Sequence, residues 1–225
     1  MDLIIFDCDG VLVDSEIIAH SLLAQMMTDL GHPMTTAETV QKFAGCSLAD
    51  TLSLIEADLT RSIPDELGQR YGRLLLERLG RELKPIAGVK AAIAALPYPR
   101  CVASSSSLER IRLSLEATGL ASLFGANIFS ATQVVHGKPA PDLYLFASSK
   151  MGITPEHCVV IEDSVVGVTA GRAAGMKVIG FAGAAHATPD AAQHLAGAGA
   201  CSVISSMVDL PTAVERWTSD GEMPR

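Results

Sequence analysis

Short runs of apolar residues recur along the chain and alternate with longer stretches that have helical periodicity. Runs of this length, rich in β-branched side chains and bounded by turn residues, are typical of buried strands. Strands separated by helices in this way form a parallel sheet with crossover helices on both faces. We therefore expect an α/β fold with a doubly wound, Rossmann-like parallel sheet. The predicted strands are Leu3–Phe6, Cys101–Ala103, Asn127–Phe129, Cys158–Ile161, Lys177–Phe181 and Cys201–Ile204.

The alternation breaks between the first and the second of these strands, where no further convincing strand occurs. Helical patterns fill the interval instead, and Asp14 or Ser15 is suited to cap the first of them. We therefore expect an inserted α-helical cap domain of residues 15–84, and a core α/β domain of residues 1–14 and 85–225. The helices expected in the cap are Glu16–Leu30, Ala37–Phe43, Leu48–Leu59 and Pro64–Leu83.

The composition is that of a folded, acidic protein. Of the 225 residues 48% are hydrophobic, and the mean hydropathy is +0.31, which excludes a disordered chain. No apolar run approaches the roughly 18–20 residues of a membrane helix, so we expect no membrane association. The net charge of −8 without a basic tract argues against nucleic acid as a partner. An acidic surface repels anions, so any phosphate site must be locally positive, through a metal or a lysine.

The cysteines and the first residues indicate a compartment. The cysteines are odd in number and lack CxxC spacing, so we expect buried, reduced thiols. The acidic Asp2 and the strand that follows at once are unlike a cleaved signal peptide. Both features favour a cytoplasmic protein. The five cysteines are Cys8, Cys46, Cys101, Cys158 and Cys201.

Polar motifs follow the first four predicted strands. Taken singly, each has an ordinary structural explanation as a loop, a turn, a helix cap or a solvated lysine. In an open parallel sheet, however, the carboxyl ends of the strands line one crevice, so we expect the motifs to converge there. The motifs are Asp7-x-Asp9-Gly10, Ser104–Ser107, Gly137–Asp142 and Glu162–Ser164.

Two carboxylates begin this series. Asp7 and Asp9 point the same way if the extended conformation persists, and two acids on one face require a cation or a shared proton. Asp7 and Asp163, with Glu162, offer the hard oxygen ligands that suit Mg²⁺.

The other two motifs offer groups that bind anions. Ser104 and the N–H groups after it open a helix, and a helix N-terminus favours phosphate. Lys138 supplies a point positive charge for phosphoryl oxygens. The sequence therefore predicts a site for phosphoryl transfer.

This ordered set resembles the haloacid dehalogenase superfamily, in the branch of β-phosphoglucomutase-like phosphatases that carry a helical cap. The residues that carry the resemblance are Phe6–Ser15, Gly137–Pro139 and Glu162–Ser164, and the similarity covers nearly the whole chain. The resemblance implies a cap that closes over the crevice and an aspartyl-phosphate intermediate. It also implies the following roles: Asp7 as nucleophile and Mg²⁺ ligand; Asp9 as general acid–base and a metal ligand through its backbone carbonyl; Ser104, Ser105 and Lys138 as phosphate-binding residues; Asp163 as a metal ligand; and Glu162 acting on the metal through water or orientation.

The expected reaction is hydrolysis of a small phosphorylated metabolite, either a sugar phosphate or a sugar-acid phosphate. A sugar phosphomutase of the β-phosphoglucomutase type is the alternative. Such mutases resemble this chain but carry a basic residue at the cap position that matches Leu48, although other basic residues of the cap could substitute for it. Dehalogenase chemistry, a signalling receiver and a non-catalytic phosphate-binding relative are more remote alternatives.

Substrate specificity is expected to lie in the cap. A monomer or a weak homodimer is expected. The candidate specificity residues are His20, Gly45, Cys46, Ser47 and Leu48.

Overall fold

The computed structural model describes residues 1–43, 48–59, 62–63 and 66–219. The chain divides into two compact units. Met1–Asp14 and Lys84–Arg225 form one, called the α/β unit, and Ser15–Leu83 form the other, called the helical unit. Among the described residues, no helix combines the length and apolar character that a membrane crossing requires.

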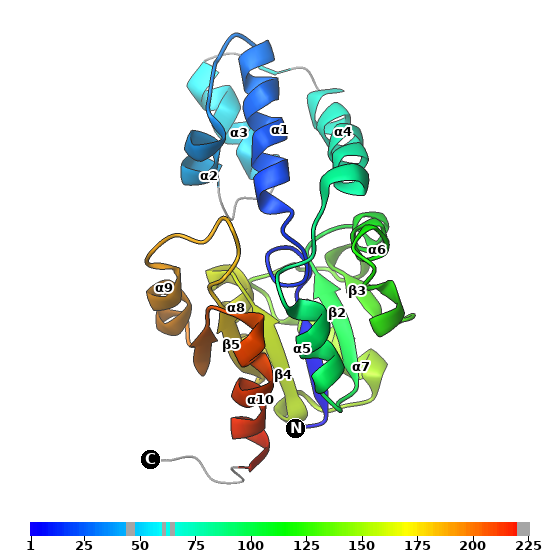
Figure 1. Ribbon diagram of the computed structural model, residues 1–225. Coiled ribbons are helices and arrows are strands. Elements are labelled where there is room, and N and C mark those ends of the chain that lie inside the picture. The colour runs from blue at the N-terminus through cyan, green and yellow to red at the C-terminus, as the bar shows by residue number, and fades with distance from the viewer. Residues whose placement is uncertain (44–47, 60–61, 64–65, 220–225) are drawn as a thin grey trace. The chain divides into compact units, whose positions relative to one another are not determined.

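Within the described residues, the α/β unit is built on a six-stranded sheet in the order β3-β2-β1-β4-β5-β6 (Figure 1). All neighbouring strands pair in parallel. The doubly wound α/β fold expected from the sequence is therefore confirmed, and β1 lies at its centre between β2 and β4. The strands are β1 (Leu3–Phe6), β2 (Arg100–Ser104), β3 (Ile128–Ser130), β4 (Cys158–Glu162), β5 (Lys177–Phe181) and β6 (Ser202–Ile204).

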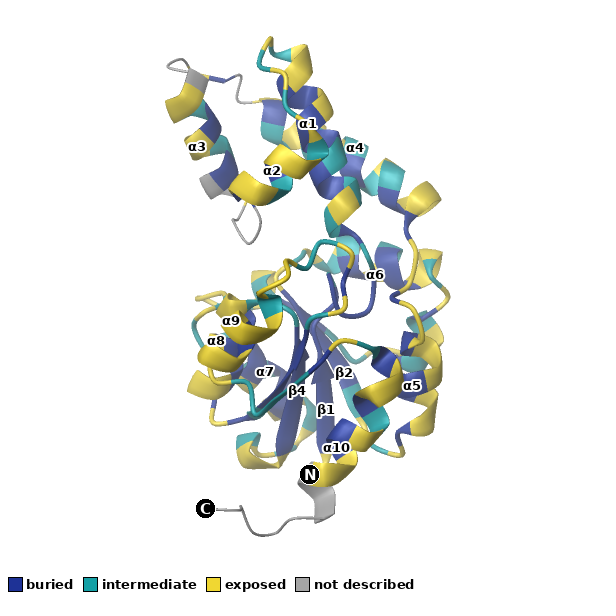
Figure 2. Cartoon of the chain, turned by 60° about the vertical axis from the view of Figure 1, so that its left-hand side comes forward, coloured by how far each residue is buried: buried dark blue, intermediate teal, exposed yellow. Residues whose placement is uncertain are grey.

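The central strands are apolar along their length because helices cover both faces of the sheet. Ile5 of β1 pairs in register with Cys101 of β2 and with Val160 of β4, and all three side chains are fully buried. Figure 2 shows these strands as continuously buried, with the exposed residues on the helices and loops around them. The short apolar runs of the sequence thus form the core of this unit.

Helices α7, α8 and α9 follow one another along one face of the sheet, and α5 and α10 pack together on the other. Close approach of α8 depends on Gly171, because a Cβ there would lie 2.7 Å from Cγ2 of Val178. The helices of this unit are α5 (Val89–Ala95), α6 (Leu108–Ala117), α7 (Asp142–Met151), α8 (Val165–Ala173), α9 (Ala191–Gly197) and α10 (Leu210–Ser219), with short 3₁₀ turns at Ala121–Leu123, Ala131–Gln133, Pro155–His157 and Met207–Asp209.

The helical unit contains α1 packed against α2 and α4. The hydroxyl of Tyr71 on α4 donates to the backbone carbonyl of Ala19 on α1 at 3.2 Å, which ties these two helices together. Ser15 occupies the N-cap position of α1, one of the two positions expected, but its side chain makes no capping hydrogen bond. The helices are α1 (Glu16–Asp29), α2 (Thr36–Phe43), α3 (Leu48–Leu59) and α4 (Glu66–Glu82).

The cysteines of the described residues are free thiols. Cys8, Cys101 and Cys158 are buried and Cys201 is half-buried, as expected for small apolar side chains in a core. Cys46 lies outside the described residues.

Candidate active site

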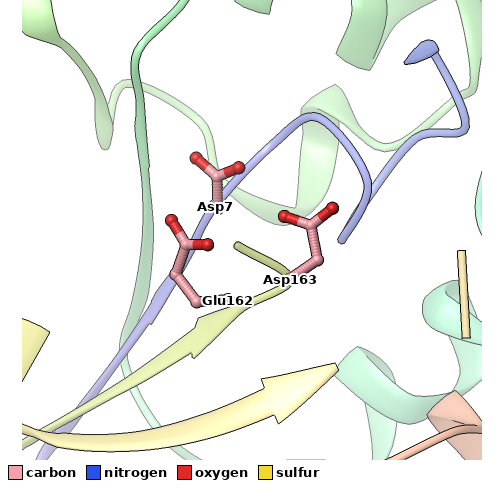
Figure 3. Close-up of side chains that lie close together, drawn as sticks. All are labelled: Asp7, Glu162 and Asp163. Atoms are coloured by element: carbon pink, nitrogen blue, oxygen red, sulfur yellow. The ribbon is translucent and has the colours of Figure 1, made fainter. Parts of the chain in front are cut away.

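Three carboxylates gather at the carboxyl ends of the two central strands. Asp7 directly follows β1, Glu162 is the last residue of β4 and Asp163 follows it. Figure 3 shows the three side chains close together, with their carboxylates extending to the same side. Each offers one oxygen such that these atoms all lie within 4.8 Å of one another. Such a buried group of carboxylates fits a divalent cation, since Mg²⁺ prefers oxygen ligands of this kind.

Lys138 lies between two of these acids. Its Nζ donates to Oδ1 of Asp7 at 2.8 Å and to Oε1 of Glu162 at 2.6 Å. The side chain is only 5% exposed. Burial would lower the pKa of Lys138, but Asp7 and Glu162 outweigh it and raise the pKa well above its usual value. Lys138 is therefore a permanent positive charge beside Asp7.

The ionised form of Asp7 is strongly disfavoured by its surroundings. Burial raises its pKa well above the usual value, Lys138 works in the opposite direction, and the Glu162 and Asp163 carboxylates raise the pKa further. A cation at the cluster would reverse this effect by stabilising the ionised carboxylates.

Both carboxylate oxygens of Glu162 accept hydrogen bonds. Oε1 accepts from Lys138 and from the Tyr144 hydroxyl at 2.9 Å, and Oε2 accepts from the backbone N–H and the hydroxyl of Ser164, both at 2.9 Å. Burial alone would raise the pKa of Glu162, but Lys138 and Ser164 bring it below its usual value. Gly167 makes room for this arrangement, since a Cβ there would overlap the Glu162 carboxylate.

Asp9 has a separate environment. Strand β1 ends at Phe6, although the Asp7 N–H still donates to the Ile161 carbonyl at 3.0 Å, and the chain turns at Gly10, where φ is +77°. Oδ1 of Asp9 accepts from Nη2 of Arg110 at 2.7 Å, and Oδ2 accepts from the Ser106 hydroxyl at 2.6 Å. The two aspartates of the motif therefore have different partners: Asp7 contacts a lysine, and Asp9 contacts an arginine and a serine.

The serine run lies at the end of β2, as its position after an apolar run indicated. Ser104 is buried; its Oγ accepts from the Ser106 N–H at 3.1 Å and lies 3.5 Å from Oδ2 of Asp9. Ser105 is exposed. Ser107 caps α6 by accepting from the Arg110 N–H at 3.3 Å. The run thus supplies one buried hydroxyl, one partner of Asp9 and one helix cap.

The structure adds three residues to those selected from the sequence, namely Arg110, Tyr144 and His186, and it gives Ser106 of the serine run a contact with Asp9. Arg110 reaches Asp9 across 101 positions of the chain, and His186 Nε2 lies 3.2 Å from Oδ2 of Asp163. The only sequence signal for Arg110 is its place in the first turn of a helix that follows a strand end. His186 follows the end of β5, within a small-residue connection that carried no motif.

The candidates in the helical unit are less well defined. His20 is buried, with 6% exposure, and its Nε2 lies 3.6 Å from a carboxylate oxygen of Glu16 one turn earlier on α1. Leu48, the first residue of α3, is 39% exposed. Gly45, Cys46 and Ser47 lie outside the described residues.

Residues 4–181 match the family of haloacid dehalogenase-like hydrolases. The chain belongs to this family. Among solved structures, a conserved haloacid dehalogenase-like protein of unknown function from Agrobacterium tumefaciens is 42% identical, with a TM-score of 0.88 and coverage of 97% of this chain and 99% of that one. A haloacid dehalogenase family hydrolase from Deinococcus radiodurans, with bound phosphate and sodium, is 32% identical, with a TM-score of 0.82 and coverage of 99% of both chains.

Several curated relatives carry phosphatase names. The 6-phosphogluconate phosphatase of Escherichia coli is 28% identical over 190 residues, which cover 84% of this chain and 86% of that protein. Other relatives named phosphatases are 30% and 31% identical. These relatives and the family support assigning the chain to the phosphoric monoester hydrolases, as the sequence motifs indicated.

Proposed function

We propose that this haloacid dehalogenase-like hydrolase is an Mg²⁺-dependent phosphatase that acts on a small phosphorylated metabolite, either a sugar phosphate or a sugar-acid phosphate, through an aspartyl-phosphate. One observation carries the proposal. The Asp7 carboxylate accepts from the ammonium of Lys138 at 2.8 Å and belongs to a cluster with the carboxylates of Glu162 and Asp163. A carboxylate so placed combines a nucleophile, a fixed positive charge and a cation-binding cluster at one point.

Asp7 is proposed to attack phosphorus, which forms the aspartyl-phosphate and breaks the bond to the leaving oxygen. Asp9 is proposed to act as the general acid–base. Its carboxylic acid gives a proton to the leaving oxygen, and the resulting carboxylate takes a proton from the water that hydrolyses the intermediate. Lys138 and the buried hydroxyl of Ser104, with the backbone after it and Ser105, would hold the phosphoryl oxygens.

The metal ligands are proposed to be the side chains of Asp7 and Asp163 and the backbone carbonyl of Asp9, with Glu162 acting through water or through orientation. Bound there, Mg²⁺ would offset negative charge on the phosphoryl oxygens and keep Asp7 ionised. The interactions of Glu162 support its indirect role, because Lys138, Tyr144 and Ser164 already engage both of its oxygens.

The proposed substrate class is based on the name of one relative and on the phosphate bound in another. The E. coli relative at 28% identity is named for 6-phosphogluconate, a sugar-acid phosphate, and the D. radiodurans structure at 32% identity holds phosphate. We propose that the helical unit serves as the cap and selects the substrate, with His20, Leu48 and residues 45–47 as candidates. A cytoplasmic location, and a monomer or weak homodimer, remain proposals from the sequence.

The test is a phosphate-release assay against a panel of sugar phosphates and sugar-acid phosphates, beside a generic aryl phosphate. We expect release that requires Mg²⁺, stops with EDTA and returns when excess Mg²⁺ is added. Acid quenching with ³²P-labelled substrate should trap a protein-bound phosphate that hydroxylamine removes, as an acyl-phosphate requires. Release that EDTA leaves unchanged would contradict the metal site, and turnover without a trapped acyl-phosphate would contradict the nucleophile.

The same assay distinguishes the proposed phosphatase from the alternative, a sugar phosphomutase. Conversion of a sugar phosphate to its isomer without free phosphate would assign the chain as a mutase. The apolar Leu48 at the position where a basic residue is expected favours hydrolysis.

A further inference from the structure

A histidine outside the sequence motifs lies against one carboxylate of the acidic cluster. His186 Nε2 is 3.2 Å from Oδ2 of Asp163, and the two side chains are 17% and 9% exposed. His186 also lies beyond residues 4–181, the part of the chain that matches the family. Neither the motifs nor the family match gives it a role.

The backbone fixes the segment that carries His186. The Ala187 N–H donates to the Ala184 carbonyl at 3.0 Å, which closes a turn around the histidine. The Ala182 N–H donates to the carbonyl of Ile204 on β6 at 2.8 Å, so the start of the segment is joined to the sheet. The backbone segment that carries the imidazole is therefore held in place next to the carboxyl ends of the strands.

Gly10 brings the loop after β1 against the same pair of side chains. A Cβ at Gly10 would overlap Oδ2 of Asp163 and would lie 3.0 Å from Cε1 of His186. Oδ2 is thus enclosed between the Gly10 backbone and the imidazole. Figure 3 shows one carboxylate oxygen of Asp163 on the side of Asp7 and Glu162, and the other on the far side.

We propose that His186 is a positioning residue for the divalent cation. Its Nε2–H donates to Oδ2 of Asp163, which restricts rotation of that carboxylate and presents its other oxygen to the cation. Ligating carboxylates generally need such an outer partner, whose loss weakens metal binding. A neutral imidazole with its proton on Nε2 is sufficient, so the role requires no change of charge. The inference rests on the proposed function, because it requires Asp163 to be a metal ligand.

The experiment measures binding of Mn²⁺ alone to the metal-free, full-length protein, from the electron paramagnetic resonance signal of free Mn²⁺, with Mg²⁺ as competitor. His186→Ala and His186→Phe should raise the Kd for both metals by about 10- to 100-fold. His186→Gln should restore most of the affinity, because its amide N–H can replace the donor. The matched control is His157→Ala, which removes an exposed histidine that lies 2.9 Å from Asp2 at the other end of β4; its Kd should equal that of the wild type.

Circular dichroism of each metal-free variant shows that it is folded before its affinity is compared. Wild-type affinity in both His186→Ala and His186→Phe would overturn the role of His186 and leave the proposed function standing. A His186→Gln variant as weak as His186→Ala would overturn the hydrogen bond as the cause. If the wild type itself binds neither Mn²⁺ nor Mg²⁺, the metal site of the proposed function fails, and this inference fails with it.

Discussion

The α/β unit and the helical unit differ in how their polar side chains are connected. In the α/β unit, residues far apart in sequence meet at the strand ends: Lys138 contacts Asp7 across 131 positions. In the helical unit, the ion pairs Glu16–His20 and Arg78–Glu82 join successive turns of one helix, and the pair Lys42–Asp58 spans only 16 positions, from α2 to α3. Long-range convergence of this kind is what a catalytic site requires, whereas local pairs mainly support helices.

Substitutions in the two units should therefore have different effects. A change at the strand ends of the α/β unit should lower turnover of every substrate by a similar factor. A change in the helical unit, if it selects the substrate, should alter the ratio between substrates.

Asp7→Asn should give the largest loss. The amide cannot form an acyl-phosphate, so kcat should fall on the order of 10⁴-fold or more on every substrate. Steady-state phosphate release measures this, with Asp2→Asn as control because Asp2 is exposed and precedes the same strand. Substantial turnover by the Asp7→Asn variant on even one substrate would contradict the nucleophile.

Lys138→Met should remove a charge that faces the phosphoryl oxygens, so kcat should fall by about 10²- to 10³-fold. It also leaves Asp7 and Glu162 buried without their cation, which should lower the free energy of unfolding by about 3–5 kcal/mol. Phosphate release and urea unfolding measure the two effects. Lys150→Met, on the exposed side of α7, is the control; equal stability of the two variants would show that Lys138 is not the partner of the buried acids.

Arg110→Ala should affect the proton transfers by releasing Asp9 from its charged partner. We expect kcat to fall by about 10- to 100-fold, less than the full contribution of a general acid–base, with little change in KM. Arg112→Ala on the same helix is exposed and should behave as the wild type. A loss that appears in KM alone would instead place Arg110 in substrate binding.

Leu48→Arg should have the smallest effect on chemistry. The side chain is 39% exposed, so an arginine can be accommodated without burial of its charge. Turnover of an aryl phosphate should stay close to the wild-type value, while kcat/KM for a sugar bisphosphate relative to a sugar monophosphate should rise by about tenfold, within the range of one added contact. An unchanged ratio would argue against Leu48 as a specificity residue.

The strands could be predicted from the sequence because short apolar runs determine where they form. Apolar runs of four or five residues cannot cover a helix face, so β1 and β5 form at the predicted residues, Leu3–Phe6 and Lys177–Phe181. Asp7 and Asp163 were found because each follows such a strand directly, and β1 and β4 are neighbours in the sheet. Their convergence follows from parallel topology alone.

Arg110, Tyr144 and His186 were not predictable in this way. Each lies on a helix or a connection, and its contact depends on the direction and reach of one side chain once the helices have packed. Asp9 illustrates the same limit. Its position in the motif was evident, but its contacts with Arg110 and Ser106 depend on how α6 and the loop before it pack.

The sequence by itself determined the order of elements along the chain: where apolar runs become strands, which carboxylates and which lysine follow them, and that a helical stretch separates the first strand from the rest. Which polar groups pair became evident only from the packed fold, with Lys138 beside Asp7, Arg110 beside Asp9 and His186 beside Asp163. The two kinds of information differ in the distance along the chain over which they act. Strand formation depends on neighbours a few residues away, whereas the pairing of charges depends on angstrom-scale distances that are set only when the whole core has packed.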